Sequence, residues 1–186
     1  MTLRQITIGC LLATALFLSG CGGGDNNNET PSTQGGSTPS SSNVLGTTTI
    51  TSTAGETIQV DMIQNGFIFH GYENKIVLLE VYGDTCPHCI EAIDSYNRLQ
   101  AKYSNDVVVI ALESYGSLTN AGRQQYITIP MQNTGNMFAF IRELTGYNRE
   151  AVPFLMVFSR DGNKVYQNIL ATFPENEIDG LIQQLL

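Results

Sequence analysis

Two hydrophobic patterns predict the first strands of a folded region. Residues 57–70, TIQVDMIQNGFIFH, alternate apolar and polar side chains on both sides of Asn65-Gly66. Asn-Gly between two strand-like runs predicts a β-hairpin, because both positions tolerate positive φ. Residues 75–83 and 106–112 are nearly continuous apolar runs, which is typical of strands buried on both faces.

Helical periodicity separates and follows these strands. Residues 87–103 and 175–186 carry apolar side chains at helical spacing, and 136–147 predicts a helix closed by Gly146. Residues 152–158 predict a strand that an Asp161-Gly162 turn joins to another at 164–170. The polar stretch 120–126 predicts a helix or turn, and 127–133 a short strand. This order indicates an α/β fold with an N-terminal β-hairpin extension, in which helices flank a central mixed sheet with a parallel crossover.

The first 55 residues have a different composition. Arg4 precedes an apolar run at 6–18 and two small residues, the layout of a secretory signal peptide too short to span a bilayer comfortably. Residues 18–21, LSGC, resemble a bacterial lipobox, which implies cleavage before Cys21 and acylation of that cysteine; the alternative is an ordinary signal peptide with a chance cysteine. Small polar residues and glycine then dominate, which predicts a flexible tether. We therefore expect a lipoprotein signal peptide at 1–20, a lipidated tether at 21–55 and one domain at 56–186.

The charge of the chain limits the classes of partner that it is expected to bind. The formal net charge is −8 and the isoelectric point is about 4.6. This balance disfavours nucleic acid and anionic membrane surfaces. The acidic residues are scattered, as on an ordinary solvated surface.

Processing leaves few cysteines for chemistry. Cys10 would leave with the signal peptide and Cys21 would carry lipid, so Cys86 and Cys89 remain as thiols in the mature chain. A structural zinc site normally needs four ligands, and His88 lies between the two cysteines, where it cannot easily turn to the same metal. We therefore expect no metal site and no cofactor. Export also implies an oxidising compartment.

A C-x-x-C pair between a buried strand and a helix start is typical of a redox site. The thiolate attacks disulfides, and a helix N-terminus stabilises that anion. We predict that Cys86 attacks and Cys89 resolves, with Pro87 at the first helical position. His88 would favour the reduced form and so make the disulfide more oxidising, unless it is a plain surface histidine. A permanent structural disulfide between Cys86 and Cys89 is the weaker alternative, since so short a loop gives little entropic stabilisation.

Glu80 and Pro153 are two further candidate residues of the site. Glu80 is a carboxylate in an apolar run six positions before Cys86, where it could carry a proton to or from Cys89; alternatively it pairs with Lys75 or Lys164. Pro153 opens a strand, a position that its missing N–H permits.

Together these residues resemble the thioredoxin superfamily over Thr57 to Leu186. The resemblance rests on Glu80, the CPHC motif at 86–89, Val152-Pro153 and the Asp161-Gly162 hairpin. It implies a thioredoxin fold in which Cys86 is the exposed nucleophile, Pro153 is a cis-proline facing it, and the Val152 backbone pairs with bound substrate. Glu80 stands at the position of the family's buried acid.

Two branches of the superfamily share these features. The opening hairpin and the long stretch before Val152 resemble TlpA/ResA-like anchored oxidoreductases, whereas Pro87-His88, Glu80 and the valine before Pro153 resemble DsbA-type oxidases. Thr85 replaces the usual tryptophan, and the chain has no room for the helical insertion of DsbA. The Pro-His dipeptide favours an oxidant and the architecture favours a reductant, so the direction of electron flow stays open.

We therefore expect an extracytoplasmic, lipid-anchored thiol–disulfide oxidoreductase of the bacterial cell envelope. Its partners would be protein thiols or disulfides and a membrane or periplasmic redox protein. The alternative is a copper-binding chaperone of the same fold, using Cys86, Cys89 and Met131 or Met156. Copper chaperones of this fold carry a C-x-x-x-C spacing and a later histidine, and this sequence has neither.

Overall fold

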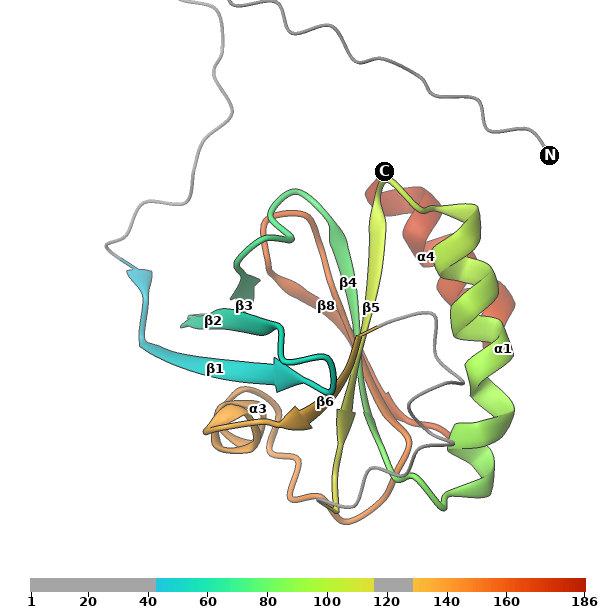
Figure 1. The fold of residues 1–186 in the computed structure, drawn as a ribbon. Helices are drawn as coiled ribbons and strands as arrows, with labels where there is room; N and C mark the ends of the chain where they lie inside the picture. The colour runs from blue at the N-terminus through green and yellow to red at the C-terminus, as the bar shows by residue number, and fades with distance from the viewer. Residues whose placement is uncertain (1–42, 116–128) are drawn as a thin grey trace, which may run out of the picture. The chain divides into compact units, whose positions relative to one another are not determined.

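Strands and helices alternate along the computed structural model, which describes residues 43–115 and 129–186 (Figure 1). The strands are β1 (Gly46–Ser52), β2 (Thr57–Ile63), β3 (Gly66–Phe69), β4 (Ile76–Tyr82), β5 (Val107–Glu113), β6 (Ile129–Asn133), β7 (Phe154–Phe158) and β8 (Lys164–Ile169). The helices are α1 (Pro87–Lys102), α3 (Met137–Thr145) and α4 (Glu175–Leu185). None of the helices in these ranges is long and apolar enough to cross a bilayer.

The eight described strands form one mixed sheet in the order β3-β2-β1-β6-β5-β4-β7-β8. Strand β4 lies near its centre, parallel to β5 and antiparallel to β7. Every residue of β4 and β5 is buried, as the continuous apolar runs predicted. The parallel β4–α1–β5 unit and both hairpins, at Asn65-Gly66 and Asp161-Gly162, are also confirmed.

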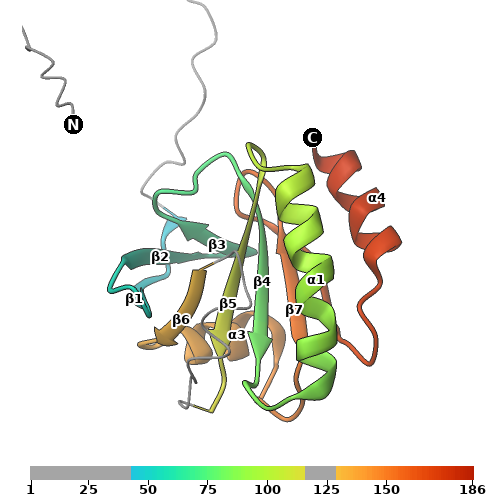
Figure 2. The ribbon, with the colours of Figure 1, turned by 45° about the vertical axis from the view of Figure 1, so that its right-hand side comes forward.

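Helices cover both faces of this sheet (Figures 1 and 2). Helices α1 and α4 lie side by side on one face, where Tyr96, Leu99 and Ile182 share a buried cluster with Leu78 of β4. Helix α3 lies on the other face and contributes Met137 and Ile141 to a second cluster. Burying an aliphatic side chain of this size contributes roughly 1.5–3 kcal/mol, so the two clusters hold the layers together.

The sheet extends further toward the N-terminus than the composition predicted. We expected residues 21–55 to form a tether, but β1 pairs with both β2 and β6. Ile50 is fully buried, and Thr48 and Ser52 are buried on the same face two residues away on either side. Threonine is β-branched and suits a strand, so a segment that looks polar by composition folds once a partner strand covers one face. The folded part therefore begins before residue 56.

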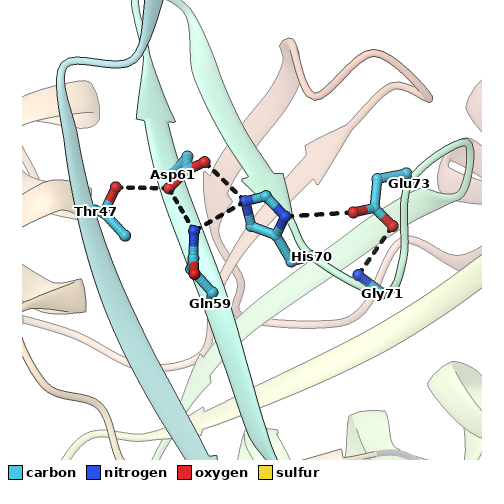
Figure 3. A network of polar contacts seen from close by, with 6 residues as sticks. All are labelled: Thr47, Gln59, Asp61, His70, Gly71 and Glu73. Atoms are coloured by element: carbon cyan, nitrogen blue, oxygen red, sulfur yellow. Dashed lines mark hydrogen bonds and ion pairs between the residues drawn. The ribbon is translucent and has the colours of Figure 1, made fainter. Parts of the chain in front are cut away.

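A polar network ties together the hairpin formed by β2 and β3 and the neighbouring β1 (Figure 3). Asp61 on β2 accepts hydrogen bonds from Thr47 of β1 at 2.7 Å and from Gln59 at 3.3 Å. The other carboxylate oxygen of Asp61 lies 2.7 Å from Nε2 of His70. The opposite ring nitrogen of His70 lies 3.4 Å from Glu73. His70 therefore bridges two carboxylates at the end of β3.

Two turns from distant parts of the chain touch at the outer strands of the sheet. Phe67 N–H donates to the Gly162 carbonyl oxygen at 3.0 Å, and Lys164 N–H donates to the Asn65 carbonyl oxygen at 2.8 Å. A Cβ atom on Gly66 would lie 1.9 Å from the Gly162 carbonyl oxygen. Only glycine permits this close approach of β3 and β8.

Several sequence predictions fall outside the described residues. They are the signal peptide at 1–20, Cys21 and the tether as far as residue 42, and the helix or turn at 120–126.

Candidate active site

Cys86 immediately precedes helix α1. It is the N-cap residue, with extended backbone angles of φ −80° and ψ 116°, and Pro87 opens the first turn as predicted. The Cys86 thiol is partly exposed. Its sulfur accepts a hydrogen bond from the Cys89 backbone N–H at 3.3 Å. The start of the helix thus directs a backbone donor at the Cys86 sulfur.

Cys89 lies one turn further along α1 and is almost completely buried, with an exposed fraction of 1 %. Burial is the largest cause that raises the pKa of the Cys89 thiol, followed by its hydrogen bond with Cys86 and then by the charge of Glu80. Cys89 is therefore protonated at neutral pH and needs a proton acceptor before it can attack a disulfide.

Glu80 occupies the middle of central strand β4 and is completely buried. Strand alternation puts Glu80 on the same face as Leu78 and Tyr82, which belong to the cluster that contains Cys89. The Glu80 carboxylate thus lies on the α1 side of the sheet, where its charge contributes to the raised pKa of Cys89.

The alternative partners of Glu80 are engaged elsewhere. Lys75 donates to the Asn105 carbonyl oxygen at 3.2 Å. Lys164 contacts the side chain of Gln167 and lies 3.5 Å from the Leu144 carbonyl oxygen.

The loop before β7 faces Cys86. The peptide bond between Val152 and Pro153 is cis, as the resemblance implied. The Cys86 thiol donates to the Val152 carbonyl oxygen at 3.5 Å. The structure thus brings together Cys86, Cys89, Val152 and Pro153, four residues that the sequence singled out.

His88 lies apart from this group. Its side chain is 57 % exposed, and its Nδ1 lies 3.4 Å from Glu91 Oε2, one turn further along α1. The contact formed by the ring is therefore with a surface carboxylate and not with either sulfur atom. The tuning role that the sequence predicted for His88 stays a prediction.

Four residues near the site were not singled out by sequence. Tyr147 donates its hydroxyl to the Ala151 carbonyl oxygen at 2.6 Å and stacks on Phe154, so it holds the loop that carries Val152. The others are Gly83, Glu113 and Tyr115, considered below. The one local signal was Glu113, a second buried carboxylate at the end of an apolar run. Among the described residues, no three His, Cys, Asp or Glu side chains are grouped so that they could hold a metal ion.

Comparison with known proteins identifies the fold. No family model and no curated protein sequence matches the chain. Solved structures do match it. One is a thiol:disulfide interchange protein of the thioredoxin family from Chlorobium tepidum, with a TM-score of 0.54 and 17 % identity over 77 % of this chain and 95 % of that one.

Two further structures agree. The thioredoxin domain of a thiol-disulfide oxidoreductase from Bacteroides vulgatus has a TM-score of 0.55 and 8 % identity over 78 % of this chain and 99 % of its own. The exposed lipoprotein thioredoxin from Streptococcus pneumoniae has a TM-score of 0.54 and 14 % identity over 75 % of this chain and 100 % of its own. The chain therefore has the thioredoxin fold, as the sequence predicted.

Proposed function

We propose that the chain is a thiol–disulfide oxidoreductase that exchanges disulfides with protein substrates through Cys86 and Cys89. The observation that carries this proposal is the pairing of two unlike thiols. Cys86 is partly exposed and accepts the Cys89 N–H at 3.3 Å, whereas Cys89 is buried one turn away. The first thiol suits attack on a partner, and the second suits release of that partner.

The exchange proceeds in two steps. The Cys86 thiolate attacks one sulfur of a substrate disulfide; a mixed disulfide forms, the substrate S–S bond breaks, and the departing thiolate takes up a proton. Cys89 then loses its proton and attacks Cys86, which forms the Cys86–Cys89 disulfide and releases the second substrate thiol. The substrate gains two electrons and the protein loses two. The same intermediate serves the reverse direction, in which substrate thiols become oxidised.

Glu80 and the Val152–Pro153 loop have distinct roles in these steps. Glu80 accepts the proton of Cys89, which is supported by its complete burial on the α1 face of β4 and by its electrostatic coupling to the thiol. The Val152 backbone pairs with the substrate segment next to Cys86, which is supported by the 3.5 Å contact between the Cys86 sulfur and the Val152 carbonyl oxygen.

We place this activity in the bacterial cell envelope, on a protein anchored through lipid on Cys21. The support is the signal-like segment at 1–20, the LSGC motif and the polar stretch that follows it. A TlpA/ResA-like protein with a DsbA-type CPHC motif fits this arrangement and implies a membrane or periplasmic redox partner. Loss of fatty-acid labelling in a Cys21→Ser variant would test the anchor.

Trapping in cells tests the activity. In a Cys89→Ala variant, mixed disulfides on Cys86 should accumulate, disappear on reduction, and be absent from the Cys86→Ala/Cys89→Ala control. Failure to find any such adduct would contradict disulfide exchange with proteins. The reduction potential of the purified protein then decides between oxidant and reductant, because a value near those of strong oxidants excludes a dedicated reductase.

A further inference from the structure

Tyr115 lies at the edge of the candidate active site, two residues beyond Glu113, the last residue of β5. Tyr115 is 59 % exposed. The ring nevertheless covers Gly83. A Cβ atom on Gly83 would lie 2.5 Å from Cε2 of Tyr115 and 3.4 Å from Cγ2 of Val152.

Gly83 connects this ring to the reacting sulfur. The Cys86 N–H donates to the Gly83 carbonyl oxygen at 2.9 Å, and the Cys86 sulfur lies 3.5 Å from the Val152 carbonyl oxygen. Tyr115, Val152 and Cys86 therefore all contact the same short turn after β4. A substrate segment joined to Cys86 through a disulfide and lying along Val152 passes beside the Tyr115 ring.

Buried groups fix the backbone at Tyr115. Its backbone N–H donates to the carboxylate of Glu113 at 2.9 Å, and Glu113 is only 2 % exposed. The preceding residue, Ser114, is 1 % exposed and donates its N–H to the Tyr82 carbonyl oxygen at 2.8 Å. An exposed ring on a fixed backbone loses little conformational entropy when it binds a partner, which suits a recognition residue.

We propose that Tyr115 is a specificity-determining residue that forms one wall of the substrate site and selects protein segments carrying an apolar side chain next to the reacting sulfur. This proposal rests on the disulfide exchange proposed above. Val152 supplies a second apolar side chain next to Gly83, and Gly83 is required because any larger residue displaces the ring. Contact with an apolar side chain changes the rate by about 10-fold or more when the pocket is well formed.

The test compares two peptides on each variant. Both peptides carry one cysteine as a mixed disulfide with 2-mercaptoethanol and differ only in the preceding residue, phenylalanine or serine. Their rates of reaction with Cys86 are measured by single-turnover mass spectrometry in the Cys89→Ala background. The readout is the ratio of the two rates, so that any effect on Cys86 itself cancels.

We expect a phenylalanine-to-serine ratio of about 10, which falls toward 1 in Tyr115→Ala and in Gly83→Ala and persists in Tyr115→Phe. Val165→Ala is the matched control. Val165 is an exposed apolar residue on β8, and it lies beside the end of β7 that is distant from Pro153. An unchanged ratio in Tyr115→Ala, or an equal fall in the control, overturns the assignment. If neither peptide reacts with the Cys89→Ala protein, the proposed function itself fails, and the inference with it.

Discussion

Glu80 combines complete burial with a position on the α1 side of central strand β4. Its charge acts on Cys89, whose pKa burial already raises. A carboxylate in this place both opposes ionisation of the thiol and offers an acceptor for the departing proton. These two effects make opposite contributions to the reactivity of Cys89, so they can be separated by one substitution.

Glu80→Gln should therefore lower the pKa of Cys89 and yet slow closure of the Cys86–Cys89 disulfide. Removing the charge makes the thiol more acidic, whereas removing the proton acceptor slows the step roughly 10- to 100-fold at pH 7. Alkylation of Cys89 as a function of pH in a Cys86→Ala background measures the first effect, and stopped-flow closure measures the second. Glu91→Gln, on the exposed side of α1, is the control. Faster closure in Glu80→Gln would exclude a proton-relay role.

Tyr147 predicts a loss of stability at alkaline pH. Burial raises its pKa to about 12, above the value near 10 of an unfolded tyrosine. The unfolded state therefore ionises first, so the free energy of unfolding is unaffected below pH 10 and falls as the pH rises from about 10 to 12. Tyr147→Phe should remove part of this fall and cost about 1 kcal/mol at pH 7 through the lost hydrogen bond to Ala151. Denaturant unfolding from pH 7 to 12 measures both, and an identical alkaline slope in the variant would contradict the assignment.

The site residues fall into those that sequence could identify and those that it could not. Cys86, Cys89 and Pro153 were identifiable because spacing and proline chemistry are local properties. Tyr115 and Gly83 were not, because their contact joins the end of β5 to the turn after β4 and exists only in the folded chain. The role of His88 stays a prediction. Adjacency in sequence puts it between the two cysteines, and in the structure its ring contacts Glu91.

At the scale of elements, local turn chemistry was a reliable guide and composition was not. Asn65-Gly66 predicted the β2–β3 hairpin because the turn depends on those two residues alone. The β1 strand was missed although its main partner is the neighbouring β2; it also pairs at its end with β6, about 80 positions later in the chain. Ile50 is the one large apolar residue of β1, so no period was visible along the sequence.

The Asp61 network of the hairpin predicts acid sensitivity. Burial alone would raise the pKa of Asp61, but hydrogen bonds from Thr47, His70 and Gln59 outweigh it and hold the pKa below its usual value (Figure 3). The network therefore stabilises the hairpin above about pH 4, and this contribution is lost as the pH falls through the depressed folded-state pKa.

Asp61→Asn should flatten the decline in stability on the acid side. Thr47→Val removes one donor and keeps the carboxylate, so it should remove a smaller part of the effect. Denaturant unfolding between about pH 2 and 6 measures both variants. An acid profile that does not change in Asp61→Asn would show that the network contributes nothing to folding stability.

At the scale of the whole molecule, Gly66 and Gly162 connect the two outermost strands. Gly66→Ala places a methyl group 1.9 Å from a backbone oxygen, so the turns must separate. We expect a cost of about 1–3 kcal/mol in the free energy of unfolding. Gly180→Ala on α4 is the control, because nothing lies within 4 Å of its added methyl group and alanine favours a helix by roughly 0.5–1 kcal/mol. Equal stabilities of wild type and Gly66→Ala would contradict the tight contact.

The meeting of these two turns also bears on how the protein avoids self-association. Strands β3 and β8 end the sheet, and an outer strand presents unpaired backbone groups that can recruit another chain. At one end of each outer strand, backbone groups of Asn65 and Phe67 bond to those of Lys164 and Gly162. The glycine contact thus occupies the start of both edges, and loosening it would free these backbone groups to pair with another chain.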